Sequence, residues 1–134
     1  MLWGFAIQIS VAQGRGTFSE KRPFKMVDGI CVYKEVDIKP KFKGNFNAFL
    51  VDKLHYPNDS AIDVSQNLSA MVQFVVYVDG TIGNFKAIGT YPDSWLSNEL
   101  IAILKLTTGM WHVAWKDRKV VDAFCIMPLR VHIN

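Results

Sequence analysis

Apolar and polar residues alternate along the last segment of the chain, Val120 to Ile133. The odd-numbered positions are all apolar: Val121, Ala123, Cys125, Met127, Leu129, Val131 and Ile133. A period of two predicts a β-strand with these side chains on a buried face and with Asp122, Phe124 and Ile126 facing outward. Pro128 has no N–H for a ladder, and prolines in sheets lie at edges, strand starts or bulges. We therefore expect an edge strand, or a bulge in one.

Two segments have the spacing of amphipathic helices. In the first, Asn45 is a plausible N-cap, Pro57 is the stop, and the inward residues are Phe46, Phe49, Leu50 and Leu54. In the second, Asp93 or Ser94 is the N-cap, Gly109 is expected at C′, and the inward residues are Leu96, Leu100, Ile103 and Leu104. Both helices should pack their apolar faces on a sheet.

Further strands are expected between these helices and before them. Residues 29–40 are β-rich and end at Pro40, which predicts a short strand. Residues 68–78 alternate again and lead into Asp79-Gly80, a pair that favours a type I′ hairpin turn because both central residues need positive φ. In the return strand the apolar positions change parity, so we expect a bulge near Gly83-Asn84.

The order of these elements predicts the fold class. A strand, a helix, a hairpin, a helix and a last strand indicate an α+β two-layer domain over residues 27–134. We expect a small antiparallel sheet of about three to four strands with two helices on one face.

The N-terminal residues 1–12 are expected to be a truncated signal-peptide segment. The apolar run from Leu2 to Ala12 is too short for the ~20 residues of a membrane span, and Ser10-Val11-Ala12 offers small residues for cleavage. An ordinary buried strand is the alternative. Residues 13–26 are polar and unpatterned, which predicts a linker. Export would place the protein in the periplasm of a Gram-negative bacterium.

Composition narrows the class of protein. The chain has 134 residues, of which 50% are hydrophobic and 13% aromatic, enough for one domain with a real core. The net charge is +3, and basic residues are concentrated in the first third. Because no run of Lys and Arg interleaves with aromatic residues, we expect no nucleic-acid partner.

Little in the sequence indicates catalysis, so we expect no enzyme, no cofactor and no metal. His55, His112 and His132 lack the spacing of metal ligands. Cys31 and Cys125 could bridge after export, but two buried free thiols are the favoured reading because Cys125 lies on the apolar face. Among the tryptophans, Trp95 and Trp111 flank the long helix and are expected to anchor it to the sheet.

Several short motifs, taken together in this order, resemble the C-terminal domain of TonB-family energy transducers, in the form common in Bacteroidota. They cover the chain from about residue 35 to its end: Pro40, Phe42 and Gly44 in a P-x-F-x-G stretch, the pair Tyr56-Pro57, Asp79-Gly80 in the hairpin, Trp111 after the second helix, and Pro128 in the last strand. The family pattern usually has glycines where this chain has Asn45 and Asp117-Arg118-Lys119.

The resemblance implies an interaction module that binds an extended peptide. Such domains present their last strand to the TonB box of an outer-membrane transporter, and main-chain hydrogen bonds supply the affinity. The implied site is the strand edge formed by Val120, Val121, Asp122, Ala123, Phe124, Cys125, Ile126 and Met127. A homodimer through this edge is a second partner that the pattern allows. The alternative function is a free-standing exported structural or regulatory domain of the same fold.

Overall fold

The computed structural model describes residues 5–9, 22–54, 68–89 and 94–133, which form ten strands and two helices. In chain order the elements are β1 (Phe5–Ile9), β2 (Phe24–Val27), β3 (Ile30–Tyr33), β4 (Lys41–Phe42), α1 (Phe46–Lys53), β5 (Leu68–Val76), β6 (Ile82–Ile88), α2 (Trp95–Lys105), β7 (Trp111–His112), β8 (Ala114–Lys116), β9 (Lys119–Val121) and β10 (Ala123–Ile133). β2 begins inside the segment that we expected to be linker.

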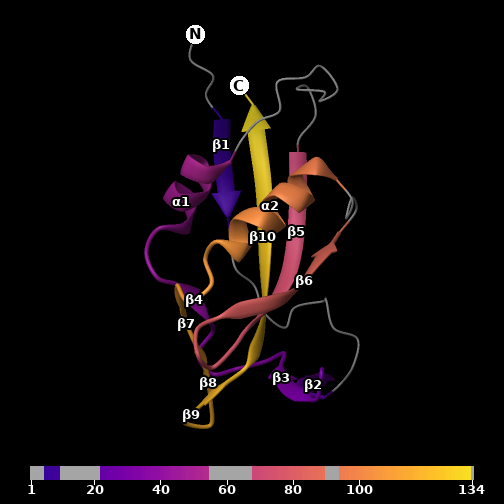
Figure 1. The fold of residues 1–134 in the computed structure, drawn as a ribbon, viewed down its shortest axis with the longest axis vertical. Coiled ribbons are helices and arrows are strands. Elements are labelled where there is room, and N and C mark those ends of the chain that lie inside the picture. Colours follow the sequence, from indigo (N-terminus) through magenta and orange to yellow (C-terminus); the bar gives the residue numbers. More distant parts are fainter. Residues whose placement is uncertain (1–4, 10–21, 55–67, 90–93, 134) are drawn as a thin grey trace.

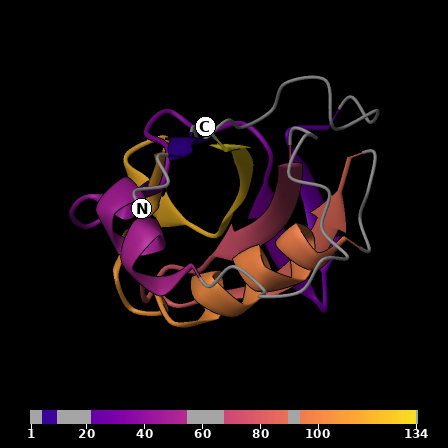
Figure 2. The ribbon, with the colours of Figure 1, turned by 90° about the horizontal axis from the view of Figure 1, so that it is seen from above.

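The main sheet has six strands and is mixed rather than antiparallel. Its order is β2-β3-β10-β5-β6, with β1 paired to β10 beside this path, and the β3–β10 pair is parallel. The expectation of a small antiparallel sheet of three to four strands is therefore wrong, and the fold is mostly β. It failed because segments at the N-terminus that lack a clear alternation join the sheet through the long β10 (Figures 1 and 2).

Both helices begin at the residues that the sequence indicates. The Asn45 side chain accepts a hydrogen bond from the N–H of Ala48, and the Ser94 side chain accepts one from the N–H of Ser97. These caps satisfy amide groups that have no partner inside a helix. α2 ends at Lys105 with Leu106 as its C-cap, so Gly109 is not the C′ residue that we expected. Pro57 lies outside the described residues.

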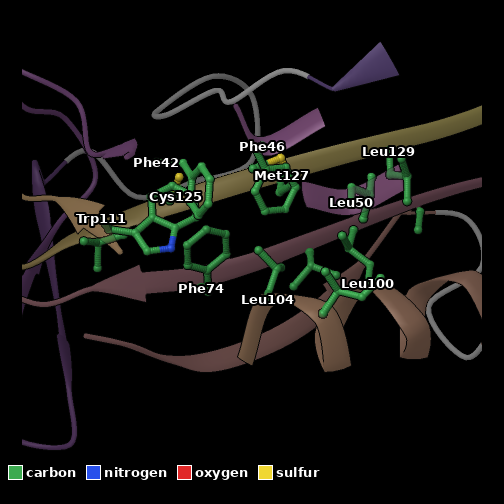
Figure 3. Close-up of a cluster of buried hydrophobic side chains, with 14 of the residues drawn as sticks. Phe42, Phe46, Leu50, Phe74, Leu100, Leu104, Trp111, Cys125, Met127 and Leu129 are labelled. Carbon is green, nitrogen blue, oxygen red and sulfur yellow. The ribbon is translucent and has the colours of Figure 1, made fainter. Parts of the chain in front are cut away.

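The main core lies between the helices and one face of the sheet. α1 contributes Phe46 and Leu50, α2 contributes four apolar residues, and β10 contributes Cys125, Met127 and Leu129 (Figure 3). The inward residues predicted for α2 are all buried: Leu96, Leu100, Ile103 and Leu104. The other face of the sheet carries a smaller core, in which the buried residues Val32, Val75 and Phe124 pack together.

The turns correct one expectation and confirm another. Asp79-Gly80 does not form a type I′ turn: the N–H of Tyr77 bonds the carbonyl of Thr81, the N–H of Gly80 bonds the carbonyl of Tyr77, and of the pair only Gly80 has positive φ, at 85°. This is a three-residue loop with glycine at the left-handed position. The bulge expected near Gly83-Asn84 is confirmed by the register shift between β5 and β6 and by a φ of 52° at Asn84.

Candidate functional site at the side of β10

β10 is not an edge strand of the main sheet. β5 pairs with one side of it from Ala123 to Val131. On the other side β3 pairs at Ala123, and β1 pairs in antiparallel register from Leu129 to Ile133. Figure 1 shows β1 along the upper half of β10, on the side opposite β5. The expectation of an open edge along the whole of Val120 to Met127 is therefore corrected: Val120 and Val121 pair with β8, and Ala123 pairs with β3. The binding role of these residues stays a prediction.

The direction of the backbone groups along β10 follows from one hydrogen bond. The N–H of Tyr33 donates to the carbonyl oxygen of Asp122 at 2.9 Å, on the side away from β5. Because backbone groups alternate between the two sides of a strand, the even-numbered residues of β10 face away from β5 and the odd-numbered residues face it. Pro128 is even-numbered, and its nitrogen points away from its partner Met71. This direction explains how a proline lies inside a paired strand.

Between the contacts with β3 and β1 there is an interval on β10 that we call the β10 gap, residues Cys125 to Pro128. Within the described chain, no strand pairs with this interval on the side away from β5. The backbones of Ile126 and Pro128 face the gap. Since Pro128 has no N–H, it removes a donor from a place where no strand of the described residues supplies an acceptor.

Side chains predicted to face outward on β10 are buried. Phe124 and Ile126 are each only 4% exposed, and Phe124 packs in the smaller core. Alternation correctly placed Ala123, Cys125, Met127 and Leu129 inside. It failed for Phe124 and Ile126 because the sheet is covered on both faces here. A proline at position 124 would therefore remove core packing as well as an N–H.

The residues at the start of the predicted site have structural contacts of their own. Asp122, between β9 and β10, accepts a hydrogen bond on Oδ1 from the N–H of Val78 at 2.8 Å, which connects the start of β10 to the β5–β6 loop. Val120 and Val121 belong to β9 rather than β10, and Val120 is exposed. Thus the structure divides the predicted site between two strands.

The thiol of Cys125 is buried, and burial raises its pKa far above the ordinary range because the thiolate would lose its hydration. A cysteine of this kind packs as a small apolar side chain and is a poor nucleophile. Cys31 is partly exposed, and both thiols are free. Only one of the two therefore fits the expectation of buried thiols.

The family-motif residues gather at the other end of the main core. Phe42 on β4 lies opposite Trp111 on β7, and their ring centroids are 5.6 Å apart. Trp111 also makes an edge contact with Phe74 at 5.2 Å, as Figure 3 shows. A side chain at Gly80 would come within 3.3 Å of the carbonyl oxygen of Trp111. Pro40 is buried and Gly44 has a φ of 108°, while Tyr56 and Pro57 lie outside the described residues.

The described residues hold neither a metal-binding cluster nor a membrane-spanning helix. No group of three His, Cys, Asp or Glu side chains that could hold a metal ion occurs in residues 22–54, 69–89 and 94–130. His112 is exposed on β7, and the side chains of His55 and His132 lie outside the described part. No described helix has the length and apolar character needed to cross a membrane.

Comparison with known proteins gives no neighbour: no family model, no curated protein and no solved structure matches this chain.

The strand that sequence reasoning missed at this site is β1. Its residues Phe5–Ile9 lie in the segment interpreted as a signal peptide, for which a buried strand was the alternative. The short apolar run was the available signal, but a run of this length does not indicate which strand it will join.

Proposed function

We propose that this chain is a protein-interaction module that binds an extended segment of a partner protein by strand addition along β10. One observation carries the proposal: β1 already pairs in antiparallel register with Leu129–Ile133, on the side of β10 that faces away from β5. That side of the strand therefore accepts an added strand. Strand addition draws its affinity from main-chain hydrogen bonds, and these depend little on the side chains of the added strand.

In this proposal β1 occupies the docking position until it is removed or displaced. Loss of the first dozen residues during export, as the small residues at positions 10–12 suggest, would uncover the upper half of β10. The uncovered part is continuous with the β10 gap, so a partner strand could pair from Ile126 onward. The backbone groups available to it are those of Ile126, Arg130 and His132, with Pro128 offering only its carbonyl.

The partner class follows from the resemblance to TonB C-terminal domains. It is an extended peptide, and the TonB box of an outer-membrane transporter in the periplasm is the specific candidate. A free-standing structural or regulatory domain is the second candidate, and the closure of β10 by β1 favours it. The two candidate functions differ in one respect: in the first, a peptide of another protein can replace β1, and in the second it cannot.

A matched pair of prolines in β1 separates the two candidates. Gln8 lies opposite Arg130 and Ile7 lies opposite Val131, so the N–H of Gln8 faces β10 whereas that of Ile7 faces away. Gln8→Pro should release β1, and Ile7→Pro should leave it paired. The probes are a synthetic peptide of residues 4–10 and a TonB-box peptide, and the measurement is amide exchange at Ile126, Arg130 and His132.

We expect the folded Gln8→Pro chain to bind both peptides and the Ile7→Pro chain to bind neither. The residue 4–10 peptide should slow exchange at Arg130 and His132 only, because in the register of β1 it ends opposite Pro128. A TonB-box peptide that extends into the β10 gap should slow exchange at Ile126 as well. Binding of the residue 4–10 peptide alone would support a strand site with a partner other than a transporter. If a folded Gln8→Pro chain binds neither peptide, the proposal fails. N-terminal sequencing of protein made from its native start in a Gram-negative host tests the export step.

A further inference from the structure

β10 carries a single permanently charged residue, Arg130, in the interval that β1 covers. Arg130 is the only Lys, Arg, Asp or Glu among the 11 residues of β10. Its side chain is exposed, and in the register with β1 it lies directly opposite Gln8. The strand that occupies the docking position therefore places a neutral residue opposite this cation.

Arg130 has no acidic residue opposite it on either neighbouring strand. On the β5 side it lies opposite Ser69, which is also exposed, and within the described part of the chain it forms no ion pair. Residues directly opposite in neighbouring strands project from the same face of a sheet. The residue opposite Arg130 in an added strand therefore projects, with Arg130 and Ser69, from an exposed face.

Main-chain hydrogen bonds do not favour a partner strand over β1, because both strands form the same ladder with β10. β1 has the further advantage that it belongs to the same chain, and a tethered strand acts at an effective concentration on the order of millimolar. A segment that replaces β1 therefore has to gain free energy from its side chains. The gain is available at positions where the sequence of β1 is not matched to β10.

The positions opposite the odd-numbered residues of β10 offer little gain. Ile9 of β1 lies opposite Leu129, and Ile7 lies opposite Val131. Leu129 is only 2% exposed and belongs to the main core, so an apolar residue is favoured opposite it. An added segment should repeat this alternation of apolar residues, but the alternation does not distinguish the segment from β1.

We propose that Arg130 is the specificity-determining residue of the strand-addition site and selects a segment with Asp or Glu at the position opposite it. This inference rests on the proposed function. In a directly opposite pair on one face, a carboxylate and a guanidinium attract each other. The partner is then an extended segment with large apolar residues at alternate positions and a carboxylate between two of them. Because the pair is exposed, salt weakens the preference.

The first test uses the folded Gln8→Pro chain and three peptides of residues 4–10: the unchanged sequence, Gln8→Glu and Gln8→Lys. Competition with a fluorescently labelled copy of the unchanged peptide, read by anisotropy, gives the three dissociation constants. The Gln8→Glu peptide should bind about two- to fivefold more tightly than the unchanged peptide, and the Gln8→Lys peptide should bind more weakly by a similar factor. High salt should reduce both differences.

Charge reversal on the protein supplies the matched comparison. Adding Arg130→Glu to the Gln8→Pro chain should reverse the order, so that the Gln8→Lys peptide binds most tightly. Lys119→Glu makes the same charge change at an exposed residue of β9, at the opposite end of the molecule in Figure 1, and should keep the original order. An Ile7→Glu peptide, changed opposite Val131, should bind weakly to all three chains.

A second test needs no free docking position. In the full chain, Gln8→Glu should slow amide exchange at Arg130 and His132 about two- to fivefold, because a stabilised β1 opens less often. In an Arg130→Glu chain the same change should speed exchange, and Gln8→Lys should slow it. An effect of Gln8→Glu that Arg130→Glu does not alter would overturn the role of Arg130.

The outcomes separate this inference from the proposed function. If the unchanged peptide binds the folded Gln8→Pro chain and the Glu and Lys peptides bind equally well, strand addition stands and the selection by Arg130 fails. If none of the three peptides binds that chain, strand addition fails and the selection of a partner fails with it. A preference for the Gln8→Glu peptide that Lys119→Glu removes as fully as Arg130→Glu would also overturn the inference, because it would reflect net charge.

Discussion

The indole nitrogen of Trp111 donates a hydrogen bond of 2.9 Å to the hydroxyl of Thr107, and that hydroxyl donates one of 2.6 Å to the carbonyl oxygen of Leu104. All three residues are buried. The hydroxyl therefore satisfies a carbonyl at the end of α2 and the indole N–H at the same time. This arrangement fixes the end of the helix against the aromatic end of the main core.

Thr107→Val should destabilise the domain by about 1–3 kcal/mol, because it leaves the buried indole N–H without an acceptor while keeping the shape of the side chain. Urea unfolding measures the loss. Thr108→Val is the control, since its hydroxyl makes an exposed hydrogen bond of 3.2 Å with the N–H of Ile82. Equal losses for the two variants would contradict the role of Thr107.

Two tryptophans four positions apart should differ widely in their contribution to stability. Trp111 is 1% exposed and contacts the rings of Phe42 and Phe74, so Trp111→Ala should cost about 3–5 kcal/mol. Trp115 is 41% exposed, and Trp115→Ala should cost less than about 1 kcal/mol. A loss below about 1 kcal/mol for Trp111→Ala in urea unfolding would place this residue outside the core.

Proline should be tolerated at position 128 of β10 but not at position 127. Met127 is buried and its N–H faces β5, so Met127→Pro should cost about 3 kcal/mol or more through the lost ladder bond and packing. Pro128→Ala should change the free energy of unfolding by only about 1 kcal/mol. The change adds an N–H that faces the β10 gap, and it raises the conformational entropy of the unfolded chain. Thermal unfolding measures both changes in stability. A loss of stability below about 1 kcal/mol for Met127→Pro would mean that the N–H of Met127 does not face β5.

Stability should fall at alkaline pH because of Cys125. Burial raises the pKa of this thiol in the folded chain, whereas in the unfolded chain it is about 8.5. The folded state then binds the proton more tightly, so the contribution to stability is full below about pH 8.5 and is lost as the pH rises above that value.

Urea midpoints measured from pH 7 to pH 10 check this expectation. The decline should be smaller in Cys125→Val than in the unchanged chain. Lysines and tyrosines also titrate in this pH range, but they are the same in both chains, so their contribution cancels in the comparison. Identical slopes for the unchanged chain and Cys125→Val would show that this thiol does not couple to folding.

The local features of this protein were determined by the sequence. Asn45 and Ser94 cap their helices as short polar side chains at N-caps do, and the spacing of Leu96, Leu100 and Leu104 defines the buried face of α2. The parity change in β6 also located the bulge at Asn84. Each of these signals acts between residues close together in the chain, where backbone geometry leaves few alternatives.

Only the tertiary structure decided which strands lie beside β10. Alternation reports which side chains face the core, but the hydrogen bonds of a sheet lie in its plane, at right angles to the side chains. The pattern of Cys125 and Met127 is therefore the same for an edge strand and for an interior one. Pro128 indicated that one side of β10 lacks a complete set of ladder hydrogen bonds. The pairing with β1 and β3, whose paired residues lie 90 or more positions earlier in the chain, determined how much of that side is covered.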